Sequence, residues 1–230
     1  MKKKLLIVAA HPDDEILGCG GFISKYKGNY DFKVMFLAEG SSCRYKDLNA
    51  DKEIIKEKIL LRKEQAAKAL NFFSIKDIVF CDLPCGRLNT IPDVKKNHLI
   101  EEQIDSFKPE VIFTHSSEDL HPDHRSVFRS VMQASRPVKN KFFVKEIYSF
   151  EILSSSEWSF TSHFKPNHFV KLDKKNLDEK WKALQFYTEE IIEAPHPRSE
   201  FGLRTLANYR GIQSGTEFAE AFCKIRTFEI

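Results

Sequence analysis

The sequence lacks a hydrophobic segment that is long enough to cross a membrane. Its N-terminal apolar run, Leu5 to Ala10, is far shorter than the roughly 20 residues of a membrane-spanning helix, and it is also too short for a signal-peptide core. A large excess of one charge is missing as well, because the formal net charge is only +3. Lysines and acids are interleaved rather than gathered in a basic stripe, so we expect no nucleic-acid partner.

Cysteine is scarce and follows no pairing pattern. The sequence has five cysteines, an odd number, and no CxxC motif. Such usage indicates reduced thiols rather than a disulfide framework, and we therefore expect a cytoplasmic protein. We interpret the thiols as structural or incidental. They belong to Cys19, Cys43, Cys81, Cys85 and Cys223.

Four short apolar runs, rich in β-branched and aromatic residues, predict buried strands. They span residues 5–10, 33–40, 77–83 and 110–115. Helical periodicity separates them and is clearest over residues 51–72. Alternation of strand and helix predicts an α/β fold with a mostly parallel sheet and helices on both faces.

The C-terminal third has a less regular pattern. It predicts strands at 145–153 and 168–172, a helix near 173–190 and a last helix near 216–223. The chain has no repeat and no linker long enough to divide it. We therefore expect a single domain over residues 1–230.

Polar residues follow the first strand directly, in the stretch AHPDDE. Ligands bind beyond the carboxyl ends of parallel strands, so His11, Asp13 and Asp14 stand where chemistry is expected. A histidine nitrogen and a carboxylate three residues apart can face one point, where a divalent metal would neutralise the crowded charge. Capping of the following helix explains the acids but not the histidine.

A second stretch of the same kind follows the strand EVIFTH. There, SSEDLHPDHRS places His121, Asp123 and His124 at another loop-to-helix junction, with Pro122 suited to the first helical turn. His121 and His124 are three residues apart and share a helical face. Two His-Pro-Asp stretches at strand ends predict a metal site.

The ligands that these two stretches offer are His11, Asp14 and His124. Two imidazoles and one carboxylate leave a position for water, as in catalytic rather than structural zinc sites. Fe²⁺ accepts the same donor set.

Three neighbours of these ligands are suited to catalysis. Asp13 stands where a general base would take a proton from the water. Protonated His121 would stabilise the developing oxyanion, and Asp123 would orient or charge a nearby ring.

At these residues the sequence resembles the PIG-L family of zinc-dependent N-acetylglucosaminyl deacetylases, also called the LmbE-like family. The resemblance rests on AHPDDE (10–15) and HPDHR (121–125), with weaker support from LAEGSS and from SGTEFAEAF (214–222), which looks like the closing helix of the family. A departure lies in DLPCGRL, because many members carry a polar or acidic residue close to the position of Cys85.

The resemblance implies a Rossmann-like α/β fold and hydrolysis of the N-acetyl group of an amino sugar. It also implies a zinc ion held by His11, Asp14 and His124, with Asp13 as general base and His121 as electrostatic partner. Neither the residues nor the resemblance selects a free, nucleotide-linked, lipid-linked or thiol-conjugated sugar. A homo-oligomer is compatible with the sequence.

Arginines are the substrate-binding residues that we predict. Arg44, Arg62 and Arg87 are suited to hold a phosphate or a sugar hydroxyl, although solvated surface arginines have the same pattern. Arg44 ranks first because it follows a strand end directly. In APHPR, His196 and Arg198 are placed to close the pocket from the C-terminal half, and an exposed proline-rich loop explains them equally well.

A nucleotide-binding protein is one alternative. Gly18, Gly20 and Gly21 follow the first strand, and Glu39 ends the second strand about twenty residues on. Their spacing is not GxGxxG, and we expect these glycines to let the first helix pack closely on the sheet.

A non-haem Fe(II) oxygenase is the other alternative. His11, Asp13 and His124 have the form of a facial triad, which would make Asp13 rather than Asp14 the ligand.

Overall fold

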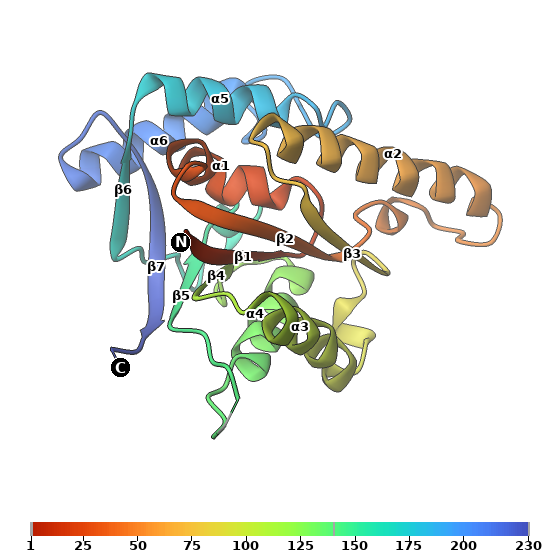
Figure 1. The fold of residues 1–230 in the computed structure, drawn as a ribbon. Helices are drawn as coiled ribbons and strands as arrows, with labels where there is room; N and C mark the ends of the chain where they lie inside the picture. Colours follow the sequence, from red (N-terminus) through yellow and green to blue (C-terminus); the bar gives the residue numbers. More distant parts are fainter. Residues whose placement is uncertain (1, 140, 230) are drawn as a thin grey trace.

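The computed structural model describes residues 2–139 and 141–229. They form a seven-stranded sheet with the strand order β3-β2-β1-β4-β5-β7-β6, flanked by helices (Figure 1). The strands are β1 (Lys3–Ala9), β2 (Tyr30–Ala38), β3 (Asp77–Leu83), β4 (Val111–His115), β5 (Glu146–Phe150), β6 (His168–Leu172) and β7 (Phe218–Thr227). The α-helices are α1 (Asp14–Tyr26), α2 (Lys52–Phe72), α3 (Asp93–Phe107), α4 (Pro122–Ala134), α5 (Lys174–Leu184) and α6 (Glu200–Ser214). Three short 3₁₀ turns are η1 (Ser42–Arg44), η2 (Leu88–Thr90) and η3 (Ser156–Trp158).

The sheet is parallel from β3 to β5, and only β7 runs antiparallel to its neighbours β5 and β6. The expected α/β fold with a mostly parallel sheet is therefore confirmed. Strand β1 lies inside the sheet, where Ile7 pairs with Val34 of β2 and Phe113 of β4. The loops that follow β1, β2, β3 and β4 consequently emerge at one edge of the sheet.

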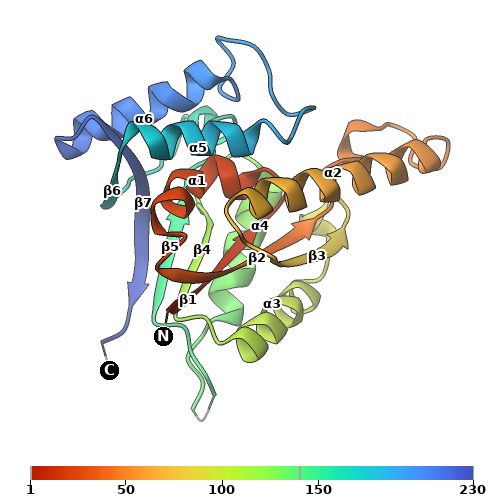
Figure 2. The same cartoon turned by 45° about the horizontal axis from the view of Figure 1, so that its top comes forward.

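Helices cover both faces of the sheet, as Figures 1 and 2 show: α1, α2, α5 and α6 lie on one face, and α3 and α4 lie on the other. Successive side chains of a strand point to opposite faces. Accordingly, Leu5 and Ile7 join the core under α1, α2 and α5, whereas Leu6 and Val8 join the core under α3 and α4. An apolar run without polar alternation is typical of a strand that is buried on both faces.

The glycines of α1 allow this helix to lie close to the sheet. A Cβ atom on Gly18 would stand 2.3 Å from the ring of Phe150, and one on Gly21 would stand 2.4 Å from Leu172. Our interpretation of the glycines as residues that pack α1 on the sheet is thus confirmed for Gly18 and Gly21, whereas a Cβ atom on Gly20 would meet Lys180 of α5 at 2.9 Å. No phosphate-binding turn is needed to explain them.

Helix α1 is broken at Cys19, whose φ of −144° is not helical. The break frees backbone N–H groups of the following residues. Gly21 and Phe22 donate these groups to the carboxylate of Glu220 on β7, at 2.8 and 2.6 Å. Lys180 of α5 pairs with the same carboxylate at 2.7 Å, so the buried charge is balanced.

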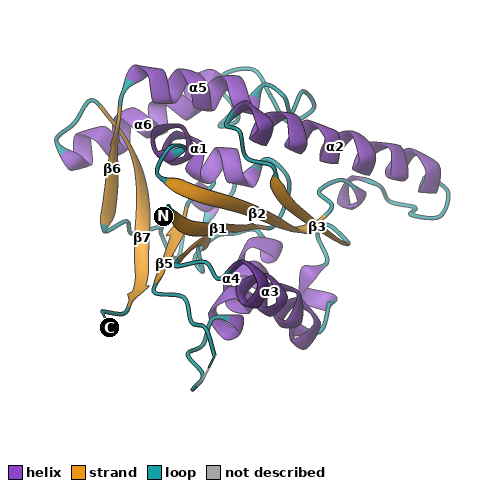
Figure 3. Cartoon of the chain, in the orientation of Figure 1, coloured by secondary structure: helices purple, strands orange, loops and turns teal. Residues whose placement is uncertain are grey.

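The predicted last helix near residues 216–223 is wrong, because this segment is strand β7 (Figure 3). The interpretation of residues 214–222 as the closing helix of the family is therefore wrong as well. Residues 219–222 are all buried between two neighbouring strands, so the sequence shows no polar alternation, and its alanines and glutamates favour helix when read alone. The helix instead precedes it as α6 and ends at Gly215, which adopts a left-handed conformation at φ 69°.

The predicted helix near 173–190 is shorter in the structure, where α5 ends at Leu184. Across residues 2–139 and 141–229, each helix is either too short or too polar to span a lipid bilayer.

Candidate metal centre and active site

The turn between β1 and α1 brings His11 and Asp14 together. Strand β1 ends at Ala9 and α1 begins at Asp14, so the intervening residues form a tight junction at the carboxyl edge of the sheet. The backbone N–H of His11 donates to Oδ2 of Asp14 at 2.8 Å, and Nδ1 of the same histidine lies 3.3 Å from that oxygen. The expected convergence of the imidazole and the carboxylate is present.

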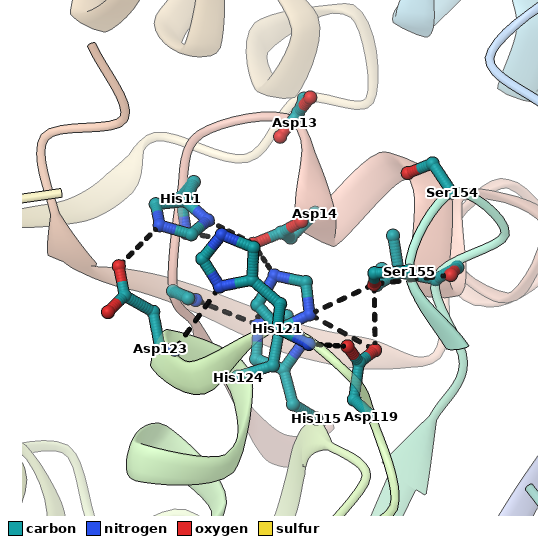
Figure 4. A network of polar contacts seen from close by, with 12 residues as sticks. His11, Asp13, Asp14, His115, Asp119, His121, Asp123, His124, Ser154 and Ser155 are labelled. Atoms are coloured by element: carbon teal, nitrogen blue, oxygen red, sulfur yellow. Dashed lines mark hydrogen bonds and ion pairs between the residues drawn. The ribbon is translucent and has the colours of Figure 1, made fainter. Parts of the chain in front are cut away.

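Helix α4 brings His124 to the same oxygen. Its Nε2 atom lies 3.4 Å from Oδ2 of Asp14, although the two residues come from separate strand-to-helix junctions. One ligand atom from each of His11, Asp14 and His124 lies within 4.8 Å of the other two, and all three residues are buried (Figure 4). The structure therefore brings the predicted ligand set together in a geometry that can hold a metal ion.

The electrostatics of this cluster favour a cation. Burial opposes a charged imidazole, but hydrogen bonds and ion pairs to Asp123 and Asp14 outweigh burial and raise the pKa of His11 to about 10. Burial likewise opposes charge on His124, and the carboxylates of Asp14 and Asp119 raise its pKa to about 9. These raised pKa values mean that both imidazoles hold their protons strongly, because carboxylates surround them. A divalent cation on the two imidazoles and the carboxylate would replace these protons, so the residues present fit such an ion.

Asp123 orients the first imidazole. Its Oδ2 atom lies 2.9 Å from Nε2 of His11, which turns the Nδ1 atom toward Asp14. Backbone N–H groups of Gly86 and Leu88 donate to the Asp123 carboxylate at 2.6 and 2.9 Å and fix its position. Carboxylates that hold the second nitrogen of a ligand histidine are a recurrent feature of metal sites.

Asp119 does the same for the second imidazole, and the sequence reasoning missed it. Its Oδ2 atom lies 3.1 Å from Nδ1 of His124. The hydroxyls of Ser155 and Ser156, in the loop after β5, donate to this oxygen at 2.9 and 2.8 Å. The available signal was the acid two residues before His121.

A third imidazole, that of His115, packs against the cluster, and the sequence reasoning missed it as well. His115 ends β4 and is fully buried, and its Nε2 accepts the backbone N–H of Ala10 at 2.8 Å. Its ring stacks on that of His124 with 4.0 Å between the centroids. Burial, together with the charge of His124, lowers the pKa of His115 to about 4, so it is neutral and packs as a spacer.

Asp13 has a separate environment on the same turn. Its φ of 120° is a left-handed value that side-chain residues rarely adopt. The Oδ2 atom lies 3.0 Å from Nη1 of Arg198 and 3.3 Å from Nη2 of Arg62, whereas the buried Oδ1 atom has no partner among the described residues. Burial raises the pKa of Asp13 to about 6 against the opposing effect of the two arginines. A carboxylate in this state can accept a proton near neutral pH.

The strained backbone of Asp13 is held by its neighbour in the helix. The N–H of Asp13 donates to Oε2 of Glu15 at 3.0 Å, and the hydroxyl of the fully buried Tyr187 donates to Oε1 at 2.5 Å. Burial raises the pKa of Glu15 to about 8. Tyr187 reaches this turn from the segment after α5, so the C-terminal part of the chain contributes to the site.

His121 caps α4 and faces both ligand histidines. Its Nδ1 atom accepts the N–H of Asp123 at 3.2 Å, and its ring lies 4.9 Å from that of His11 and 4.6 Å from that of His124. Burial and the neighbouring imidazoles lower the pKa of His121 to about 4. The protonated form that we expected is thus disfavoured. Because Nδ1 accepts, the neutral ring carries its proton on Nε2.

The predicted substrate-binding arginines separate into two groups. Arg44 and Arg62 both pair with Glu190, which lies between α5 and α6, and Arg198 pairs with the same carboxylate. Arg62 is buried, and its guanidinium forms ion pairs with Asp13 and Glu190. Arg87 lies at the start of η2, and in residues 2–139 and 141–229 its side chain makes no ion pair. Substrate binding by these three arginines stays a prediction.

A family model and two relatives of this chain agree on one family. The model of the PIG-L family, described as GlcNAc-PI de-N-acetylase, matches residues 6–135. The chain is 27% identical over 227 residues to the diacetylchitobiose deacetylase of Thermococcus kodakarensis, with 95% of this chain and 81% of that protein covered. It is 30% identical over 139 residues to a Bacillus subtilis protein named probable N-acetyl-alpha-D-glucosaminyl L-malate deacetylase 2, with 58% and 61% covered.

Among solved structures, the fold is similar to that of GalB, the 4-carboxy-2-hydroxymuconate hydratase of Pseudomonas putida. The TM-score is 0.75 at 20% identity, and 99% of each chain is covered. Since a hydratase shares the fold, the fold alone does not select the reaction, and the side chains of the site must be considered.

Proposed function

The chain belongs to the PIG-L family, and from this premise we propose that it removes the N-acetyl group from an N-acetylated amino sugar or sugar conjugate. The observation that carries the proposal is the convergence of His11, Asp14 and His124 next to Asp13, whose buried Oδ1 atom has no partner among the described residues. The names of the two relatives given above, one of them a probable assignment, are those of deacetylases that act on diacetylchitobiose and on N-acetyl-alpha-D-glucosaminyl L-malate.

We propose Zn²⁺ as the metal, held by His11, Asp14 and His124, while Fe²⁺ fits the same donors. When bound, the ion would polarise the amide carbonyl and lower the pKa of a water molecule beside it. The Oδ1 atom of Asp13 takes a proton from the attacking water and returns it to the departing amine, so that acetate and a free amino sugar leave.

His121 serves as a hydrogen-bond donor to the oxygen that gains negative charge. Its neutral ring carries the donating proton on Nε2, because Nδ1 accepts from the backbone of Asp123. A fixed donor of this kind is effective without carrying a charge. Asp123 contributes by holding His11, which makes it a positioning residue.

We further propose that residues 1–230 act as one deacetylase domain. Arg198 reaches Asp13 and Tyr187 reaches Glu15, although both lie outside the matched residues 6–135. Glu190 gathers the guanidinium groups of Arg44, Arg62 and Arg198 next to the base. Arg44, which is about half exposed, is the member of this group with donors left for a substrate. The cytoplasmic location inferred from cysteine usage stays a prediction.

Acetate release from a panel of N-acetylated sugars tests the proposal. Zinc-loaded protein is incubated with N-acetylglucosamine, N,N′-diacetylchitobiose, a nucleotide-linked N-acetylglucosamine and N-acetylglucosaminyl malate. We expect acetate and free amine in equal amounts from at least one of them, and release that is about 10²- to 10⁴-fold slower from an Asp13→Asn variant that still binds zinc. Absence of acetate throughout would contradict the proposal.

The oxygenase alternative is tested in the same preparation loaded with Fe²⁺. That alternative needs Asp13 as the metal ligand, whereas Asp13 contacts Arg62 and Arg198 and it is Asp14 that joins the two histidines. Oxygen consumption that depends on 2-oxoglutarate would favour the oxygenase over the deacetylase.

A further inference from the structure

Two thiols that are distant in sequence lie side by side next to the proposed active site. Cys43 belongs to η1 and Cys85 to the loop after β3, and the Cys85 thiol donates to Sγ of Cys43 at 3.0 Å, across 42 positions of sequence. Gly86 permits this approach, because a Cβ atom there would stand 2.9 Å from Cβ of Cys43. The family motifs do not account for this pair.

Two further metal donors face the same point. One ligand atom each from His11, Cys85 and Asp123 lies within 4.8 Å of the other two, and all three residues are buried. His11 presents Nδ1 to Asp14 and Nε2 to Asp123. Cys85 and Asp123 therefore lie on the side of this imidazole that faces away from the proposed catalytic ion, and Cys43 adjoins them through its contact with Cys85.

We propose that Cys85, Asp123 and Nε2 of His11 form a second binding site, specific for a thiophilic divalent cation such as Zn²⁺, and that the neighbouring Cys43 turns its thiol to the cation as the fourth ligand. Two thiolates and a carboxylate match the ligands that zinc takes in tetrahedral sites, and thiolate selects zinc over magnesium or calcium. The exposed Cys43 gives the cation access from solvent. Binding releases both thiol protons to the buffer.

Occupation of this site inhibits the proposed reaction. A cation on Asp123 competes for the Oδ2 atom that now holds Nε2 of His11 and the N–H of Gly86. His11 then loses the contact that turns its Nδ1 toward Asp14. An excess of zinc is therefore expected to fill the second site and to lower activity, while the first equivalent supports it.

Cobalt titration tests the site without any assay of catalysis. Reduced, metal-free protein is titrated with Co²⁺, bound metal is counted, and the sulfur-to-cobalt charge-transfer band in the near ultraviolet is followed. We expect two bound ions and a charge-transfer band for the unmodified chain. For Cys43→Ser/Cys85→Ser we expect one ion and no band. Cys223→Ser, which removes a thiol of β7, should behave like the unmodified chain.

A single bound ion in the unmodified chain, or a charge-transfer band that persists in the double variant, would overturn the proposal. Circular dichroism of each variant checks that it is folded, and Cys43→Ser alone, at an exposed position, should weaken the band without loss of structure. Because ion counting needs no substrate, its result stands even if the deacetylase proposal fails. Inhibition is measured separately, as acetate release that falls with excess zinc in the unmodified chain but not in the double variant.

Discussion

The Nε2 atom of His11 lies 2.9 Å from Oδ2 of Asp123, although 112 positions separate the two residues. This contact joins the junction after β1 to the start of α4, the two segments that carry the proposed metal ligands. The carboxylate itself rests on the backbone N–H groups of Gly86 and Leu88, so a third loop is tied to the same point. Orientation of the ligand imidazole thus depends on three separate segments of the chain.

Replacing Asp123 by Asn should weaken the catalytic metal site without removing a ligand. The amide keeps the shape but loses the charge that fixes the His11 ring, and loss of such a partner typically costs about 10- to 100-fold in metal affinity. Zinc competition with a chelating dye measures the change, in the Cys43→Ser/Cys85→Ser background so that one site is counted. Asp178→Asn, which removes an exposed acid of α5, is the control. Equal affinities of the two variants would contradict the role of Asp123.

Replacing Asp13 by Asn should lower turnover while zinc content stays the same. Asn has a similar size and tolerates a positive φ, but its amide cannot accept the proton of the water. Loss of a general base reduces rates by about 10²- to 10⁴-fold. Acetate release and metal analysis are made on the same samples. Full activity in this variant would show that another group is the base.

Replacing Arg198 by Met should shift the acid limb of the pH profile. Burial raises the pKa of Asp13, and the Arg198 cation opposes this effect, so removing the cation raises that pKa further. The base must be deprotonated to act, and therefore kcat/KM should fall at a higher pH in the variant than in the unmodified chain. Arg204→Met, which removes an arginine paired with Asp178 on α5, should leave the profile in place. A shift toward lower pH would contradict the assigned contact.

Replacing Glu220 by Gln should destabilise the fold. The carboxylate accepts the amides freed by the break in α1 and neutralises the buried Lys180. Leaving one charge of a buried pair without its partner costs about 3–5 kcal/mol. Urea unfolding followed by circular dichroism should show a lower midpoint for Glu220→Gln than for the exposed control Glu217→Gln. Equal midpoints would mean that the amides and the lysine find other partners.

The part of the fold that builds the site was predictable from the sequence, because its strands are buried on both faces and end in polar motifs. Residues 110–115, for example, were predicted as a strand, and the structure contains β4 over residues 111–115, all of them buried. Strand β7 was not predictable in this way. Its buried Glu220 is explained only by the break in α1, nearly two hundred positions away in sequence.

In the candidate site, too, some residues were predictable from the sequence and others were not. The spacing of His11 and Asp14 and the repeated His-Pro-Asp stretch predicted which side chains would meet. Asp123 was predicted to orient a nearby ring, and it contacts His11. Asp119 and His115 were missed, because they act through contacts that no local pattern displays. The environment of Asp13 likewise depends on Arg198, which reaches it from beyond α5.

Anomalous diffraction at the zinc absorption edge, from crystals of protein loaded with one equivalent of zinc, tests the central claim most directly. The account predicts a peak of anomalous density bonded to Nδ1 of His11, a carboxylate oxygen of Asp14 and Nε2 of His124. A zinc ion ligated by Asp13 in place of Asp14, or zinc bound elsewhere with these three side chains free of metal, would contradict it.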